Sequence, residues 1–404
     1  MLRMPQNTTG ATPLAGVLVL TGLCSLGTGV FWHGMPFIAK HSYQFGQTRT
    51  LVLYAAMGLI YAVGAFSAGR LTRRLERWVS PRGVLCAVIG TQAVVCVCPI
   101  AFEGEWALWL AAGAGTFFAS IIWPVIESYL TAGRHGPSMR SAIGWFNFTW
   151  AVCVAIPLFV MAPILQKHGE WTIGGFAAAS LVGLAVLAWF PSRPGHHDPD
   201  LADAHVAAEY PALLQSARVL LPLSYVLSSA MSPILPYRFE ALGVAVWWET
   251  PATATWTIVR VLVFAVMWRL DFWRGRWGAL LLGALTMTGG FALVVAGPSL
   301  LLVLVGLGGL GVGVGVIYYA ALYYAMEVGR AAIDAGGTHE GLIGTGYVCG
   351  PLAGLLGGVL TPGRGAGIVG VVWTVTALGA IAALRPYIRA RGRREKRCAM
   401  RDAR

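Results

Sequence analysis

Hydrophobic residues along this chain gather into twelve long runs that are separated by short polar segments. Each run is close to the ~20 residues that a helix needs to cross a lipid bilayer. Because lipid cannot satisfy backbone hydrogen bonds, each run is predicted to be a transmembrane helix, and the fold class is an all-α integral membrane protein. The predicted helices cover residues 14–39, 50–69, 84–102, 106–133, 141–165, 171–190, 213–236, 250–268, 277–297, 299–326, 340–360 and 367–385.

The sequence also contains an internal repeat at an offset close to half its length. A short basic motif that starts at Arg70 recurs 199 positions later at Arg269, and the run around Gly115 aligns with Gly311 at an offset of 196. Such repeats are typical of secondary transporters, in which the substrate site lies between two similar halves. The sequence therefore predicts two pseudo-symmetric six-helix bundles.

The predicted domain organisation follows from this repeat. Residues 1–191 form an N-terminal bundle, and residues 213–386 form a C-terminal bundle. The most polar connection, residues 192–212, is predicted to be a cytosolic linker. Residues 387–404 form a basic cytosolic tail, which is expected to rest on anionic lipid.

Composition and charge distribution fix the environment of the chain. Charged residues make up 11% of it, against about 25% in an ordinary soluble domain, and the mean hydropathy is +0.67. With the N-terminus placed in the cytosol, cytosolic segments hold 23 of the 29 Lys and Arg residues. This distribution predicts cytosolic termini in the plasma (inner) membrane, and it argues against a nucleic-acid partner despite the net charge of +12. We expect a monomer whose partners are the bilayer and a small-molecule substrate.

Other function classes lose support from missing motifs. The lysines are Lys40, Lys167 and Lys396, and none follows glycine and precedes Ser or Thr, so the chain has no P-loop for ATP. Residues that could converge on a catalytic centre are scattered in depth, and the cysteines lack the spacing of zinc ligands. We therefore expect no enzyme activity, no metal site and no cofactor. An ion or solute gradient is the expected energy source.

The connection between the second and third runs carries a resemblance to a known family. It runs from Gly69 to Trp78 and resembles the signature turn of the major facilitator superfamily, whose members are transporters with twelve helices in two six-helix halves. The residues that match the family pattern are Gly69, Leu71, Arg74 and Arg77. The resemblance implies a gate turn between helices rather than a substrate site. Arg73 stands where the family has an acid, and Glu76 is a candidate for the missing carboxylate.

The eleventh run contains a glycine face. Its glycines at positions 346, 350, 354 and 358 fall on one side of a helix and predict close helix contact, with a bend at Pro351. The segment is similar to the antiporter motif of the same family. That motif belongs on helix five, so the resemblance does not imply an antiporter.

Two charges inside the predicted helices are the first candidates for function. Arg260 lies nine residues from Arg269, which is about 13 Å from the cytosolic edge, and Glu127 lies about 10 Å deep. A charge in lipid costs roughly 2.5 kcal/mol or more, so each needs a reason. Three interpretations remain open. Arg260 and Glu127 form an ion pair between the halves, or Arg260 binds an anionic substrate while Glu127 takes a proton, or both belong to fixed structural pairs, with Arg134 or Arg140 as the partner of Glu127.

Polar and aromatic residues complete the predicted site. His33, near the outer end of the first run, is a second candidate for proton coupling, with an interfacial histidine as the alternative. Ser228 lies on a polar face of the seventh run, where Pro233 is expected to weaken the helix, although serines also serve helix packing. The remaining candidates for substrate binding are Asn147, Trp150, Tyr225, Tyr319 and Tyr323.

These observations predict a secondary active transporter that moves a small organic solute by alternating access and is linked to protons. An organic anion or an amphipathic aromatic molecule would suit a cavity with aromatic walls and one positive charge. The alternative is a transporter-like receptor or assembly protein that binds its ligand without flux.

Overall fold

The computed structural model of this chain describes residues 12–75, 77–134, 136–195, 207–328, 333–361 and 365–402. Within these ranges the chain forms helices and no strands, and twelve helical segments are long and apolar enough to cross a membrane. The predicted all-α fold class and the twelve transmembrane helices are therefore confirmed. Of the predicted site residues, Glu76 lies outside the described residues.

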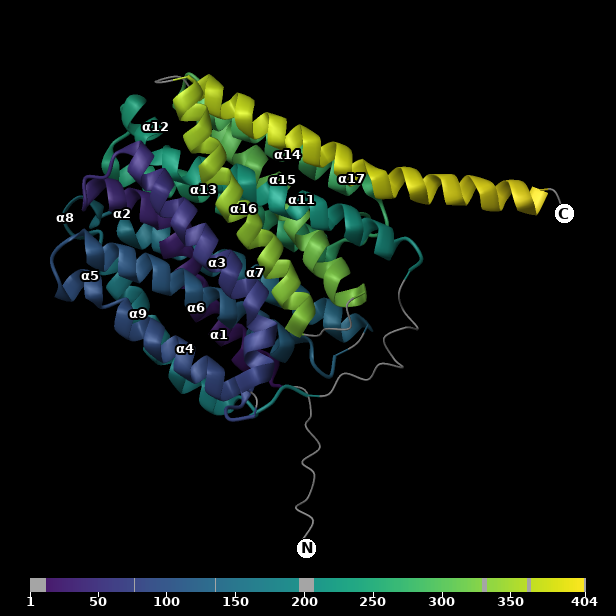
Figure 1. The fold of residues 1–404 in the computed structure, drawn as a ribbon, viewed down its shortest axis with the longest axis horizontal. Helices are drawn as coiled ribbons and strands as arrows, with labels where there is room; N and C mark the ends of the chain where they lie inside the picture. Colours follow the sequence, from purple (N-terminus) through teal and green to yellow (C-terminus); the bar gives the residue numbers. More distant parts are fainter. Residues whose placement is uncertain are drawn as a thin grey trace, which may run out of the picture.

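The first six membrane spans form one bundle, coloured purple to blue-green in Figure 1. Several spans consist of more than one helical element because the winding changes inside them. The elements are α1 (Leu14–Thr28), η1 (Gly29–Gly34), α2 (Met35–His41), α3 (Gln47–Leu75), α4 (Pro81–Val95), α5 (Cys98–Ala101), α6 (Glu105–Thr131), α7 (Gly136–Met161), α8 (Leu165–His168), α9 (Trp171–Val186) and η2 (Leu187–Trp189).

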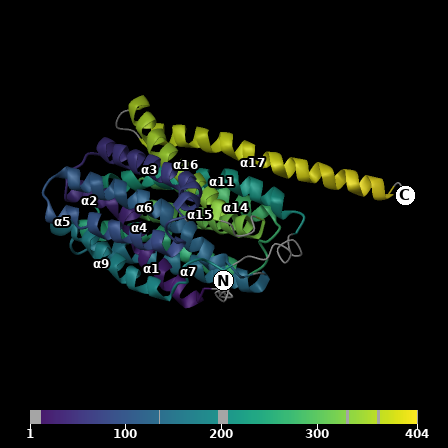
Figure 2. The same cartoon turned by 60° about the horizontal axis from the view of Figure 1, so that its bottom comes forward.

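The last six spans form a second bundle, teal to yellow, which lies beside the first (Figure 1). Its final helix runs well past the bundle, as Figure 2 also shows, so the predicted basic tail begins inside this helix rather than after it. The elements are α11 (Tyr210–Met231), η4 (Ser232–Ile234), α12 (Leu235–Ala241), α13 (Val246–Arg269), α14 (Trp277–Ala296), α15 (Leu300–Val328), α16 (Ile333–Leu360) and α17 (Gly365–Asp402).

The first span of each bundle is interrupted at the same place. In the first bundle the interruption is the π-helical segment η1, and in the second it is the 3-10 segment η4. The short helices that follow, α2 and α12, have seven residues each, carry proline at their second position and are related by an offset of 200. The weak point predicted near Pro233 is thus confirmed, whereas the equivalent break in the first span was not predicted.

Glycines bring helices of the two bundles into close contact. A Cβ atom added to Gly344 of α16 would lie 2.6 Å from the Cα atom of Ala62 in α3. A Cβ added to Gly58 of α3 would lie 2.4 Å from the carbonyl oxygen of Tyr347 in α16. Because backbone atoms cannot move aside, these positions accept only glycine at the present spacing of the helices. The α3–α16 contact is therefore one of the seams between the halves.

The predicted glycine face of α16 is confirmed at three of its four positions. A Cβ at Gly346 or Gly350 would lie 2.4 Å or less from the nearest atom of α11, and one at Gly354 would meet Leu51 at 2.9 Å. Gly358 has nothing within 4 Å, so the prediction of close contact is wrong there. The face thus packs α16 against its own bundle and against the other one.

Candidate functional site

A cavity lies between the two bundles, beside both interrupted spans. The space in it that the centre of a water molecule can occupy is about 10 Å³, which is room for about one water. The site is therefore nearly closed in this conformation, and a solute could enter only after the halves move apart. The residues that line it are Thr28, Trp32, His33, Tyr54, Trp150, Tyr225, Ser228, Ser229, Ser232, Trp256, Arg260 and Tyr347.

Arg260 is the charged group of this cavity. It is 1% exposed, and its guanidinium carbon lies 4.3 Å from the ring centroid of Trp150 and 4.7 Å from that of Trp256. Since Trp150 belongs to the first bundle, this cation–π contact crosses between the halves. The Nε and Nη2 atoms of Arg260 are buried and have no hydrogen-bond partner among the described residues.

The aromatic contacts do not compensate fully for the burial of this charge. Cation–π contacts contribute about 2 kcal/mol when desolvated, whereas burying an unpaired ion costs several kcal/mol. Two of the guanidinium nitrogens also lack an acceptor. The arrangement therefore favours an anionic ligand group that would supply both the charge and the acceptors.

A second part of the cavity extends toward Glu340 of α16. Its lining shares Thr28, Trp32, Trp150, Tyr225 and Tyr347 with the part around Arg260, so the two parts are neighbours along one aromatic wall. Glu340 is 4% exposed and accepts a hydrogen bond from the Tyr61 hydroxyl. The further residues that line only this part are Tyr61, Trp123, Tyr318, Glu340 and Ile343.

Glu127 lies close to this second part. It is 2% exposed, and neither carboxylate oxygen has a hydrogen-bond partner among the described residues. It lies one helical turn from Trp123, which lines this part of the cavity together with Glu340 of the other half. The Arg134 guanidinium instead donates to the carbonyl oxygens of Leu130, at 2.5 Å, and of Tyr129, at 3.2 Å. Neither an ion pair between Glu127 and Arg260 nor a fixed pair of Glu127 with Arg134 or Arg140 is formed in this conformation.

The other sequence candidates fall into two groups. Trp150, Tyr225, Ser228 and His33 line the cavity with Arg260. The remaining three occupy other surroundings. Asn147 is fully buried one turn before Trp150, and both polar atoms of its amide lack a partner among the described residues.

Tyr319 and Tyr323 pack around Trp273, at ring-centroid distances of 5.7 Å and 5.2 Å. Trp273 lies in the connection between α13 and α14, which is the second copy of the repeated basic motif, and its indole N–H donates to the Met267 carbonyl at 2.7 Å. These two tyrosines therefore support that turn. Tyr318 from the same helix is the one that reaches the cavity, where it stacks on Trp150 at 5.1 Å.

His33 is more central than its place in the sequence indicates. It lies in η1, is 6% exposed, and its ring packs edge-on against Trp256 at 4.7 Å. The side chain is therefore buried inside the protein and lines the same cavity as Arg260. The π-helical winding of Gly29–Gly34 turns this segment inward, since all six of its residues are buried.

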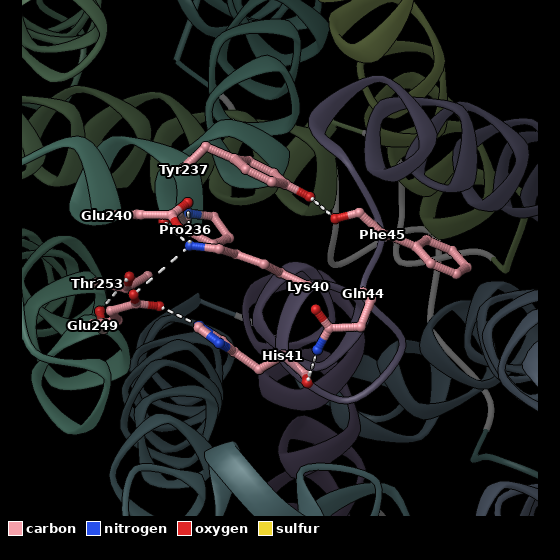
Figure 3. A network of polar contacts seen from close by, with 9 residues as sticks. All are labelled: Lys40, His41, Gln44, Phe45, Pro236, Tyr237, Glu240, Glu249 and Thr253. Atoms are coloured by element: carbon pink, nitrogen blue, oxygen red, sulfur yellow. Dashed lines mark hydrogen bonds and ion pairs between the residues drawn. The ribbon is translucent and has the colours of Figure 1, made fainter.

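A polar network bridges the halves at one end of the bundles, here called the Lys40 end. Figure 3 shows Lys40 and His41 of α2 reaching toward Glu240 and Glu249 of the second bundle. The Lys40 Nζ atom lies 3.1 Å from Glu240 and 4.0 Å from Glu249, and it donates to the Pro236 carbonyl at 2.7 Å. The His41 Nε2 atom lies 2.8 Å from the Glu249 carboxylate.

A tyrosine reinforces the same closure. The Tyr237 hydroxyl of α12 donates to the Phe45 carbonyl at 2.7 Å and lies 2.8 Å from the Thr50 hydroxyl. Glu249, only 1% exposed, is the buried centre of the network and was not singled out from the sequence. The cavity is thus sealed at the Lys40 end by charged and polar contacts between the halves.

The gate turn lies at the opposite end, and most of it is helical. Because α3 continues to Leu75, the matching residues Gly69, Leu71 and Arg74 lie in its final turns. Arg77 follows in a short connection that ends at Ser80, whose hydroxyl caps α4 by accepting a hydrogen bond from the Gly83 N–H at 3.2 Å. The role of this turn as a gate between helices stays a prediction.

Comparison with known proteins finds similar folds among solved structures. The sequence matches no model of a known protein family and no curated protein. Solved structures of similar fold include those of two transporters. The human organic anion transporter MFSD10 (TETRAN) superposes with a TM-score of 0.65 at 13% identity, covering 94% of this chain and 100% of that one. The nucleoside transporter NupG superposes with a TM-score of 0.62 at 13% identity, covering 93% and 98%.

Both similarities span almost the whole chain, and both proteins are transporters. The chain therefore shares with these two proteins a fold of twelve membrane-spanning helices in two bundles, with a cavity between them. This is the fold that the resemblance of the Gly69–Trp78 turn to the major facilitator superfamily predicted. At 13% identity the similarity concerns the fold and leaves the substrate open.

Proposed function

We propose that this protein is a secondary transporter that moves a small organic solute with an anionic group, using Arg260 as the anchor for that group. The observation that carries the proposal is the buried guanidinium between Trp150 and Trp256, without a carboxylate partner among the described residues. Arg260 comes from one half and Trp150 from the other. A solute bound there would contact both halves, as alternating access requires.

The distribution of basic residues orients the proposed cycle. Positive residues favour the cytosolic side, which supports an orientation with both termini and the gate turn in the cytosol and the Lys40 end outside. The network of Lys40, His41 and Glu249 then acts as the outer gate, and this conformation is the one with that gate closed. A plasma (inner) membrane location is consistent with this orientation.

Proton linkage is the second component of the proposal. The Glu127 carboxylate is buried, lacks a hydrogen-bond donor among the described residues and lies near a second carboxylate, Glu340. Two ionised carboxylates in a low-dielectric site repel each other, so one of them holds a proton while the site is occluded. Release of that proton on one side of the membrane would couple solute movement to the proton gradient.

Ligand-dependent thermal stability of the purified protein tests the anion anchor. A ligand that binds only the folded state raises the melting temperature, so wild type should be stabilised by some organic anions in a panel of anions, cations and neutral solutes. Arg260→Gln should lose that response. Arg238→Gln should keep it, since Arg238 belongs to the same half but donates to the Gly297 carbonyl instead of lining the cavity. Equal responses of all three proteins would refute the anchor.

Flux measurements separate transport from binding alone. In proteoliposomes, the identified anion should accumulate when a pH gradient is imposed, and Glu127→Gln should transport without responding to that gradient. Saturable binding without flux would favour the receptor alternative. Flux that ignores the gradient in wild type would refute the proton linkage while leaving the transporter in place.

A further inference from the structure

The central cavity has two chemically different ends. Arg260 lines one end and Glu340 lines the other, and five residues line both. Both charged side chains are at least nine-tenths buried, at 1% and 4% exposure. A ligand that lies along the shared wall of Trp32, Trp150 and Tyr347 would therefore meet a cation at one end and a carboxylate at the other.

Like Arg260, Glu340 lies among aromatic side chains of the cavity. Trp32, Tyr225 and Tyr347 line the same part of the cavity as the carboxylate, and the Tyr61 hydroxyl donates to it. These rings also pack on one another, with centroid distances of 5.0–5.7 Å. Aromatic faces next to a carboxylate are the combination that binds ammonium groups. At the other end of the same cavity, Trp150 and Trp256 already hold the guanidinium of Arg260 in this way. At the Glu340 end the described residues supply no lysine or arginine in an ion pair with the carboxylate.

The balance of charge also distinguishes between ligands. With Glu127 protonated, Arg260 and Glu340 carry one charge of each sign, and the empty cavity is neutral. An anion alone would leave a net negative charge in a site almost without water, which is costly. A ligand with one carboxylate and one ammonium group keeps the cavity neutral and gives each protein charge a partner.

We propose that the Glu340 end binds an ammonium group, and that the transported solute is a zwitterion with an aromatic or other flat apolar body between its charges. The proposal rests on the proposed function, since Arg260 would hold the carboxylate of the same molecule. The Tyr61 hydroxyl keeps the Glu340 carboxylate oriented toward the aromatic rings. Glu127 contributes the proton site and does not contact the ammonium group.

Three matched probes test the two ends separately. Para-(aminomethyl)benzoate carries both charges across a benzene ring, para-toluate carries only the carboxylate, and para-methylbenzylamine carries only the ammonium group. Phenylalanine is a second zwitterion with its charges on one carbon. Dissociation constants come from the dependence of the melting temperature on ligand concentration, for wild type, Arg260→Gln and Glu340→Gln. Glu105→Gln is the control, because Glu105 is 40% exposed and pairs with Arg49 away from the cavity.

We expect one of the zwitterions to bind wild type about tenfold or more tightly than either singly charged probe, as one extra charged hydrogen bond would give. Glu340→Gln should weaken the zwitterion and the amine and strengthen para-toluate, because it removes a negative charge from the cavity. Arg260→Gln should weaken the zwitterion and para-toluate and strengthen the amine, because it removes a positive charge. Glu105→Gln should match wild type with every probe.

Two results would overturn the ammonium site and leave the proposed function intact. In the first, neither zwitterion binds wild type more tightly than para-toluate. In the second, Glu340→Gln leaves the binding of the amine and of both zwitterions unchanged, which shows that Glu340 does not bind their ammonium group. By contrast, para-toluate binding that is insensitive to Arg260→Gln would refute the proposed function, while an amine that depends on Glu340 would still support the ammonium site.

Discussion

The network at the Lys40 end predicts that loss of one buried carboxylate opens the cavity on that side. Glu249→Gln keeps the shape of the side chain but removes the charge that His41 contacts at 2.8 Å and Lys40 at 4.0 Å. A hydrogen bond to a charged group contributes about 1.5–3 kcal/mol, and Lys40 would keep Glu240 and the Pro236 carbonyl as partners. We therefore expect the closed arrangement to lose about 2 kcal/mol relative to the open one, which is about 30-fold in their ratio.

Cysteine labelling measures this ratio directly. Ser228 is 4% exposed and lines the cavity, so Ser228→Cys in a background without native cysteines reports access from the Lys40 end. A membrane-impermeant thiol reagent is added on that side, and the labelling rate should rise up to about 30-fold when Glu249→Gln is introduced.

A second carboxylate at the same end provides the control. Glu105 pairs with Arg49 inside the first bundle, both side chains are at least 40% exposed, and such pairs contribute about 0–1 kcal/mol. Glu105→Gln should therefore leave the labelling rate of Ser228→Cys nearly unchanged. If Glu249→Gln has no effect, or has the same effect as Glu105→Gln, the contacts at the Lys40 end do not hold the halves together.

Two further predictions concern stability, measured as the thermal unfolding of the purified protein in detergent. Gly344→Ala should destabilise the protein by about 1–3 kcal/mol, because the new Cβ meets the α3 backbone. Gly358→Ala in the same helix is the control, because a Cβ there has open space and should not destabilise the protein. Equal melting temperatures of the two variants would contradict the close contact between α3 and α16. Arg134→Met should lower the free energy of unfolding by about 1–3 kcal/mol, because the carbonyls of Tyr129 and Leu130 lose their hydrogen-bond donor. An unchanged melting temperature would show that these hydrogen bonds do not contribute to stability.

The helices could be predicted because lipid leaves the backbone few alternatives. Every long apolar run had to be a helix, and the prolines near Pro233 marked the weak point of the seventh span. The matching break in the first span was missed because Pro36 follows the irregular segment and lies in the first turn of α2, where proline is well tolerated. The π-helical winding of Gly29–Gly34 depends on packing that no local pattern records.

The charged residues of the site were predictable only well inside the apolar runs. Arg260 stands out in the middle of its run, whereas Glu340 and Glu249 fall at the edges of theirs, where a charge is expected to reach water. The helices begin earlier than the apolar pattern indicates, α16 at Ile333 and α13 at Val246, so both carboxylates lie within helices and are buried. A boundary error of a few residues thus hid two buried carboxylates, Glu340 in the cavity and Glu249 at the Lys40 end.

The choice among the tyrosines of α15 shows a different limit. Tyr318, Tyr319 and Tyr323 are all buried, and the sequence gives no reason to prefer one. Only the rotation of α15 against its neighbours decides that Tyr318 faces Trp150 while Tyr319 and Tyr323 face Trp273. Helix rotation is set by tertiary packing, which periodicity alone does not determine in a helix that is apolar on all sides.

The matched interruptions in the first and seventh spans bear on the ancestry of the chain. Because α2 and α12 keep the same length, the same proline position and one offset of 200, the simplest origin of the match is an ancestral six-helix unit that carried the interruption before duplication. The two descendants then diverged in opposite directions, one by widening the helix into π winding and the other by tightening it into 3-10 winding. On this account the bend was inherited by both halves, whereas the local hydrogen bonding changed separately in each.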